Sequence, residues 1–401
     1  MIGKTTTEKV EHNSPTIALF QLGFRPFFLA SALFAVIGMF IWMVETTFSI
    51  PLLPIHTSPI FWHAHEMIYG YGLAVIAGFL LTAVRNWTGV QTPQGRALQW
   101  LFLLWVLARL TSLISGQWAQ MTAAILDSLF ILYLAIALTL PIVRAKRWKN
   151  LAVVSKIYFF FIGHLIYILG MLGVLPDGQR IGIYIGLYMV LSLILLLSRR
   201  VMPMFIENGV GYSVSLKNHA WLDIACLIFF LAFAVTDIFF VAPKLMASFA
   251  GVLVVLHSVR IWGWHSRGIW HKSLLWVLYI AYIWVIIGFA LKAAVVFGLS
   301  PFLALHAFAV GGIGMMTLGM MSRVSLGHTG RNIMQPPSGI ALAFAMLCLG
   351  AFIRVILPLL FAGYDSLWIA MSQALWIAAF SLFAYLYAFI LIRPRIDGKA
   401  G

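Results

Sequence analysis

Charged residues are scarce in this chain of 401 amino acids: 9% are Asp, Glu, Lys or Arg, whereas 63% are hydrophobic. Soluble domains carry about 25% charged and about 45–50% apolar residues, so this composition excludes a soluble globular protein. Cysteine is nearly absent as well. Cys226 and Cys348 lie far apart in separate apolar runs, which excludes a disulfide framework or a CxxC metal site and predicts buried packing for both.

Familiar targeting and catalytic signatures are also missing. Residues 1–21 contain Lys4, Glu8, Lys9 and Glu11 but no apolar core, so they do not form a cleavable signal peptide, and we expect a cytoplasmic tail. We find no Ser-His-Asp order, P-loop or dinucleotide fingerprint. Function must therefore be sought in residues placed within the membrane.

Long apolar runs dominate the chain, whose mean hydropathy is +1.00. A helix needs about 20 apolar residues to cross a bilayer, and about twelve such runs are present. They cover residues 27–45, 60–84, 96–114, 119–143, 151–174, 180–200, 219–240, 243–263, 272–298, 301–323, 338–361 and 366–392. Alternating strand-length segments are absent, which excludes a barrel. We predict an all-α fold: a polytopic transmembrane helical bundle of about 12 spans, with one domain over 22–393, a cytoplasmic tail over 394–401, and a loop or short interfacial helix over 199–218.

Lysine and arginine are distributed unevenly along the connecting segments. With the amino terminus inside, the outer loops hold only Arg180 and Lys244, while nearly all other basic residues of the loops and tails fall on the inner side. Positive residues mark the cytoplasmic side, so we expect both termini in the cytoplasm. The net charge of +15 is then explained by the inner membrane surface, and the lipid bilayer rather than nucleic acid is the expected partner.

The ionisable residues inside the spans share one layer. By depth along each predicted span, most fall in the outer half: His63, His65, Glu66, Arg109, Asp127, Lys292, His306 and Arg354. Intramembrane charges are costly, so a shared layer predicts a common polar site. The alternative is that the basic residues pair with Glu66 or Asp127 for structural reasons, or reach the interface, and we favour this reading for Lys292.

The segment His63-Ala64-His65-Glu66 has three ionisable residues within four positions, more than any other part of this layer. At about 100° per residue, His63 and His65 point about 160° apart, so one metal ion cannot take both from a regular helix. His63 should share a face with Glu66, and His65 should share one with Tyr69. His306 is the best partner for one of this pair. Imidazole is a good ligand for iron and copper, so haem or copper would suit the site.

Two further histidines lie within spans. His257, toward the inner end of its span, is an additional candidate metal ligand, whereas His164 stands alone in mid-span and is expected to be a core residue.

Four stretches resemble the NnrS family, which comprises haem- and copper-containing membrane proteins associated with denitrification and nitric oxide stress. They are residues 22–28 (LGFRPFF), 62–67 (WHAHEM) continuing through 77–89, Arg199-Arg200-Val201 with Pro203 and Phe205, and His306 followed by Arg323 and 326–331 (LGHTGR). Arg85 stands where the family has proline, and Tyr279 stands where members often have histidine.

The resemblance implies a protein of the bacterial inner membrane that binds haem and copper and acts in the response to nitric oxide or nitrosative stress. His63, His65 and His306 would ligate the metal, and Glu66 would orient a ligand or carry protons. Arg25 and Arg109 would pair with haem propionates. Two alternatives stay open. One is a proton-coupled transporter in which Glu66, Asp127 and His306 relay protons; the other is a sensor or assembly factor without turnover.

Overall fold

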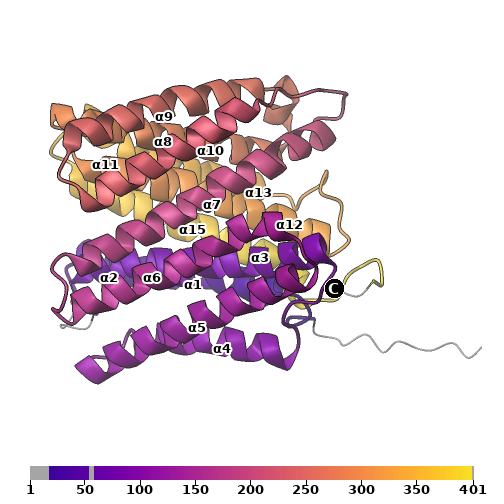
Figure 1. Cartoon of the computed structure of the whole chain (residues 1–401), viewed down its shortest axis with the longest axis horizontal. Coiled ribbons are helices and arrows are strands. Elements are labelled where there is room, and N and C mark those ends of the chain that lie inside the picture. The colour runs from indigo at the N-terminus through magenta and orange to yellow at the C-terminus, as the bar shows by residue number, and fades with distance from the viewer. Residues whose placement is uncertain (1–17, 54–57, 400–401) are drawn as a thin grey trace, which may run out of the picture.

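The structure is a computed structural model that describes residues 18–53 and 58–399, and within these ranges it contains helices and no strand (Figure 1). The main helices are α1 (Phe24–Thr46), α2 (Pro59–His65), α3 (Leu73–Thr88), α4 (Arg96–Thr111), α5 (Gln117–Arg144), α6 (Leu151–Met171), α7 (Gly178–Gly209), α8 (Ala220–Phe239), α9 (Pro243–Gly263), α10 (Ser273–Ala294), α11 (Pro301–His306), α12 (Met315–His328), α13 (Ile340–Val355), α14 (Leu357–Leu360) and α15 (Asp365–Ile392). Two π-helical segments, η1 (Glu66–Gly72) and η5 (Ala307–Gly314), join α2 to α3 and α11 to α12. Short 3₁₀ turns are η2 (Trp148–Asn150), η3 (Arg267–His271) and η4 (Val295–Phe297).

The predicted polytopic bundle is confirmed. Eleven helical stretches within the described ranges are long and apolar enough to cross a membrane. The remaining predicted span, 96–114, corresponds to α4, which has 16 residues and is therefore about 24 Å long at 1.5 Å per residue. Cys226 and Cys348 are both free; Cys226 is buried as predicted, whereas Cys348 is only partly buried.

The prediction for 199–218 was wrong over its first half. Helix α7 continues through Pro203 to Gly209. Arg199 donates to Asp223 (2.7 Å), and the Arg200 guanidinium lies 4.4 Å from the centre of the Trp87 ring. These contacts tie the helix extension to its neighbours.

Helix packing follows a pattern that recurs every four spans. In each group the first helix packs on the second and the third on the fourth: α1 on α3 and α4 on α5, then α6 on α7 and α8 on α9, then α10 on α12 and α13 on α15. The fourth helix of each group also packs on the first helix of the next, and α15 closes the ring against α1. The chain therefore forms three groups of four helices around a common centre.

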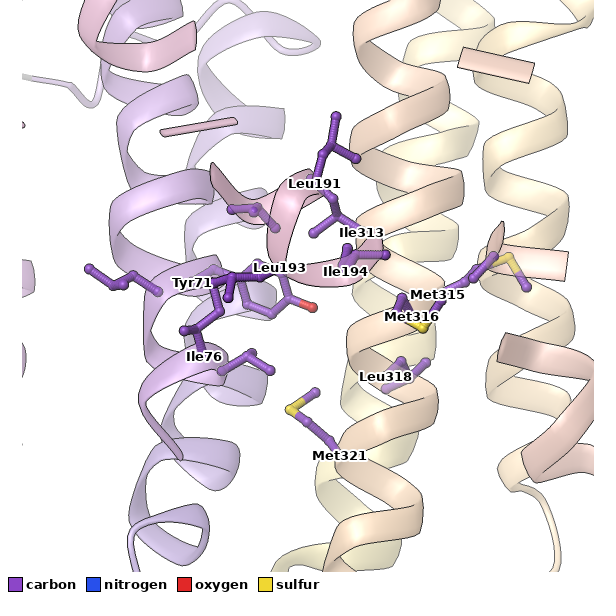
Figure 2. Packing of buried hydrophobic residues seen from close by; sticks show 14 of the residues in the cluster. Tyr71, Ile76, Leu191, Leu193, Ile194, Ile313, Met315, Met316, Leu318 and Met321 are labelled. Atoms are coloured by element: carbon purple, nitrogen blue, oxygen red, sulfur yellow. The ribbon is translucent and has the colours of Figure 1, made fainter. Parts of the chain in front are cut away.

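The second helix of each group, α3, α7 or α12, meets the others at this centre. Ile76, Leu193, Ile194 and Met316 gather there (Figure 2), beside an apolar cavity of about 70 Å³. The Tyr71 hydroxyl and Thr317 Oγ1 form a hydrogen bond of 2.5 Å that joins η1 to α12. The centre of the bundle is thus packed mainly by apolar side chains.

Residues near both ends of the described part of the chain are hydrogen-bonded to the bundle. Ala18 N–H donates to Ile392 O (2.7 Å), and Arg395 donates to His328 O (3.0 Å). Hydrogen bonds from Arg395 lower the pKa of Asp397 to about 2. The end of the bundle that holds these contacts lies opposite α2 and α11 (Figure 1). The predicted tail residues 1–17 and 400–401 fall outside the described residues.

Close packing of α6 on α7 depends on small residues. A Cβ added at Gly182 would lie 2.4 Å from the backbone oxygen of Gly163, which cannot move aside without shifting α6. We expect Gly182→Ala to lower the free energy of unfolding by about 1–3 kcal/mol because it forces the two helices apart. Thermal unfolding in detergent measures this effect.

Gly251→Ala is the matched control, because a Cβ at Gly251 meets no atom within 4 Å. Alanine in a helix interior gains up to about 1 kcal/mol over glycine, so this variant should be as stable as the parent or slightly more so. Equal destabilisation of the two variants would contradict the proposed role of the α6–α7 contact.

Candidate functional site

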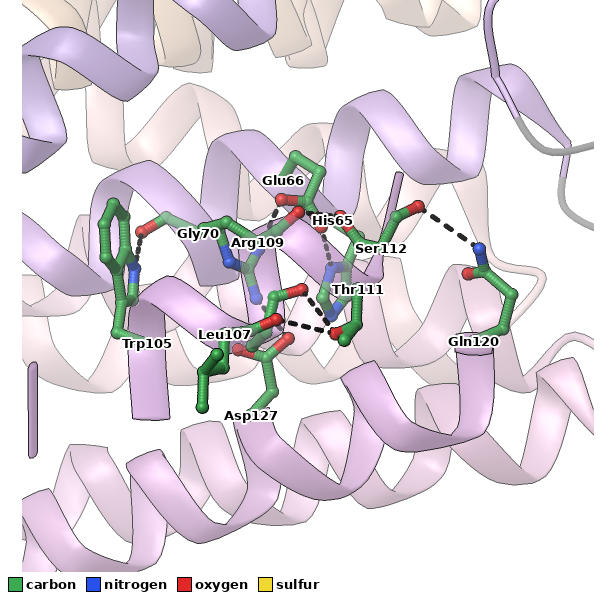
Figure 3. A network of polar contacts seen from close by, with 11 residues as sticks. His65, Glu66, Gly70, Trp105, Leu107, Arg109, Thr111, Ser112, Gln120 and Asp127 are labelled. Atoms are coloured by element: carbon green, nitrogen blue, oxygen red, sulfur yellow. Dashed lines mark hydrogen bonds and ion pairs between the residues drawn. The ribbon is translucent and has the colours of Figure 1, made fainter. Parts of the chain in front are cut away.

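Arg109 is the centre of a buried ionic network. From the last turn of α4, its guanidinium donates through one nitrogen to Glu66 at the start of η1 and through the other to Asp127 on α5 (Figure 3). All three side chains are at most 5% exposed. Two carboxylates share one guanidinium, so in its ionised form the network carries one uncompensated negative charge. In a low-dielectric interior such a charge calls for a cation or a proton.

Local backbone geometry makes room for this network. A Cβ at Gly70 would lie 2.7 Å from Arg109 Nη1 and 3.2 Å from Glu66 Oε2, so glycine lets the guanidinium approach the helix. The π-helical segment also leaves Gly70 O available to accept a hydrogen bond from Trp105 Nε1 (3.0 Å). Insertions of this kind are frequent at functional sites.

His65 connects the network to a second histidine. Its Nδ1 lies 3.1 Å from Glu66 Oε1, and its ring stacks on Tyr69 and Tyr167 at centroid distances of 5.0 and 4.7 Å. The His164 ring on α6 lies 5.3 Å away, and its Nδ1 is 3.2 Å from Ser128 Oγ. In each histidine Nδ1 thus faces a protein partner, which leaves Nε2 available to bind a ligand.

Among the described residues, three buried ligand atoms of this group have no hydrogen-bond partner. They are His65 Nε2, His164 Nε2 and Asp127 Oδ1. Ligand atoms from these three residues lie within 4.8 Å of one another. Metal–ligand bonds of about 2.0–2.2 Å place two ligands of one ion at most about 4.4 Å apart, so a small shift would bring all three into coordination. Two imidazoles and one carboxylate suit a divalent first-row metal ion, and the negative charge of the network favours one.

The helical-phase prediction that His65 shares a face with Tyr69 is confirmed, because the two rings stack at 5.0 Å. His63 points elsewhere and stacks on Trp42 at 4.4 Å. Glu66 contacts its neighbour His65 as well as Arg109. The helix changes from α to π at Glu66, directly after these histidines.

His306 and Arg354 form a separate neighbourhood. His306 Nδ1 lies 2.7 Å from Phe302 O, and Arg354 Nη2 lies 3.4 Å from His306 Nε2. Both ring nitrogens of His306 therefore have protein partners. Nδ1 of His63 is buried and has no hydrogen-bond partner in the part of the chain that the structure describes.

The remaining candidate residues lie apart from the His65 cluster. Arg25 donates to the carbonyls of Leu391 and Arg393 at the end of α15 (2.9 and 2.7 Å). His257 Nδ1 lies 2.6 Å from Tyr282 Oη and 4.0 Å from Cys226 Sγ in the α8–α10 group.

Haem fits these surroundings less well than a single ion does. The arginines proposed for its propionates, Arg25 and Arg109, hydrogen-bond to protein acceptors. The apolar cavity at the centre of the bundle is not lined by His63, His65, His257 or His306. The residues around His65 therefore favour a single metal ion over haem.

Sequence reasoning missed the roles of two ionisable residues within the spans. His164 was expected to be a core residue, because nothing in the sequence indicates that α6 lies beside α2 and α5. Asp237 was overlooked near the end of its span, although it accepts two hydrogen bonds from Lys292 (2.7 and 2.9 Å) and one from Tyr188. Lys292 thus pairs with an acid, as the structural interpretation expected, but with a different one.

Helices that span a membrane and a buried set of imidazole and carboxylate groups define the class: a polytopic membrane protein with a candidate intramembrane metal site. The chain belongs to the NnrS family, because the family described as "NnrS protein" matches residues 18–395. The resemblance of the four sequence stretches is thereby confirmed over nearly the whole chain. No curated protein matches the sequence.

Proposed function

We propose that this protein is a metal-binding protein of the bacterial inner membrane that acts in the response to nitric oxide, linked to denitrification or nitrosative stress. One observation carries the proposal: His65, His164 and Asp127 each hold a buried polar atom with no hydrogen-bond partner among the described residues, and ligand atoms of the three residues lie within 4.8 Å of one another. Copper is the first candidate ion, because imidazole-rich sites prefer it among divalent first-row metals. Haem enters the proposal only through the family resemblance.

Each neighbour has a role in holding the ligands. Glu66 accepts from His65 Nδ1–H and Ser128 orients His164, so both rings keep Nε2 free for the ion. Arg109 fixes Asp127 by binding one of its oxygens and leaving the other available. When bound, the ion would supply a site for a small ligand such as nitric oxide.

The test is the metal content and optical spectrum of the protein purified from membranes, before and after addition of nitric oxide. We expect near-stoichiometric copper or iron and a spectrum that changes with nitric oxide. A preparation without bound metal, without a Soret band, and unable to take up added copper would contradict the proposal.

A proton-coupled transporter is the second candidate, favoured by the same uncompensated charge, because a proton neutralises it as well as a metal does. The buried Lys292–Asp237 pair is a second ionisable group in the bundle. Proton-driven flux in proteoliposomes that is abolished by Glu66→Gln, in protein that binds no metal, would favour this function over the first.

A further inference from the structure

A polar cavity lies at the opposite end of the bundle from the His65 cluster. It has a volume of about 120 Å³ and lies where α7 ends, α10 begins and α12 ends. His271, Lys272, Ser273 and Arg323 supply its polar wall, with Met334 and Pro336 opposite. None of the described residues that line it is acidic. The cavity is therefore positively charged and large enough for a small anion.

The amino terminus of α10 opens into this cavity. This helix has 22 residues, its N-cap is Lys272, no side chain caps it, and its first turn holds no acidic residue. Its internal hydrogen bonds start with Leu275 N and Trp276 N, which both donate to Lys272 O (2.9 and 3.0 Å). The preceding amides, of Ser273 and Leu274, lie at the positive end of the helix dipole. Serine, threonine, aspartate or asparagine is usual at an N-cap, and lysine adds a positive charge where the dipole already is positive.

Arg323 supplies independent evidence for a ligand. Its side chain comes from α12, lines the cavity, and is 7% exposed. The guanidinium stacks on Phe205 at 3.9 Å, and among the described residues it has no hydrogen bond or ion pair. A largely buried guanidinium without a counter-charge is unfavourable, so an anion bound in the cavity beside Arg323 would be stabilised.

We propose that this cavity binds a phosphate-type oxyanion, either free phosphate or the phosphate of an anionic lipid head group. A guanidinium fork, an ammonium group and helix amino-terminal amides are the groups that bind phosphate oxygens in proteins. The cavity volume of about 120 Å³ is sufficient for one phosphate group. Met334, which is 36% exposed, gives the cavity an apolar edge that a lipid could contact. This site does not depend on the proposed metal site.

The experiment uses the full-length protein and two probes. Inorganic phosphate is titrated against chloride at equal ionic strength while the Tm is followed, and native mass spectrometry measures retention of phosphatidylglycerol from mixed nanodiscs. We expect the parent to bind at least one probe, and Arg323→Gln to weaken that binding about tenfold or more, because a charge-assisted hydrogen bond is lost. Lys272→Gln should weaken it in the same direction, which keeps the test valid if Arg323→Gln does not fold.

Arg267→Gln is the matched control, because Arg267 is exposed, lies five residues before Lys272, and does not line the cavity. It should bind like the parent. Binding of phosphate identifies the free anion, whereas retention of phosphatidylglycerol alone identifies the lipid. The proposal would be overturned if the parent bound neither probe, or if Arg323→Gln and Lys272→Gln both bound as tightly as the parent. Metal content should be the same in all these variants, so failure here is distinct from failure of the proposed function.

Discussion

Replacing Arg109 with leucine is expected to lower the free energy of unfolding by about 3–5 kcal/mol, because it leaves Glu66 and Asp127 as two buried carboxylates with no cation. Arg109→Lys should recover part of this loss. It restores a positive charge, but an ammonium cannot bind both carboxylates as the planar guanidinium does. Thermal unfolding of the purified variants in detergent, compared with the parent, measures both effects.

A control and a rescue separate the ionic network from the loss of side-chain packing. Arg96 lies at the other end of α4 and is exposed, so Arg96→Leu should change the stability little. Adding Glu66→Gln and Asp127→Asn to Arg109→Leu removes both uncompensated charges and should restore much of the Tm. If the triple variant were no more stable than Arg109→Leu alone, the explanation by buried charge would be wrong.

Hydropathy was sufficient to predict the helices because each span must hide its own backbone groups in lipid. The hydropathy prediction was wrong where contacts between helices, rather than lipid, determine the structure. Helix α7 extends past Arg200 because contacts of Arg199 and Arg200 with neighbouring helices hold the extension. Of the threefold arrangement, the sequence shows only a short similarity between two of the groups, Ser198-Arg199-Arg200-Val201 on α7 and Ser322-Arg323-Val324 on α12. It became visible through helix contacts, which a single sequence does not contain.

The sequence predicted how deep in the membrane the site residues lie, but not which of them contact one another. The layer argument placed Glu66, Arg109 and Asp127 together, and the structure joins them directly. Depth alone does not say which helices are neighbours, so His164 could not be linked to His65. The sequence of η1 also gives no sign that the helix widens from α to π at Glu66.

The ligand assignment predicts that His164→Leu will reduce metal affinity by at least about 100-fold, because outer-sphere partners alone are worth about 10–100-fold and His164 is a direct donor. Leucine is similar in size to histidine and leaves the Glu66–Arg109–Asp127 network intact, so the protein should still fold. Among the described residues, His164 has no hydrogen bond to Glu66, Arg109 or Asp127; its ring lies beside those of His65 and Tyr69, and its Nδ1 faces Ser128. Copper titration followed by elemental analysis measures the affinity, and the Tm without metal checks folding.

His306→Leu is the discriminating comparison. Both His306 ring nitrogens already have protein partners in Phe302 and Arg354, so its loss should leave metal affinity at the His65 cluster within about threefold of the parent. Ser128→Ala should have an intermediate effect of about tenfold, because Ser128 only orients His164. The opposite order, with His306→Leu losing the metal and His164→Leu keeping it, would move the metal site to the His63–His306 neighbourhood. The buried negative charge at Asp127 would then need a proton to neutralise it, which is the condition for proton transfer through this network.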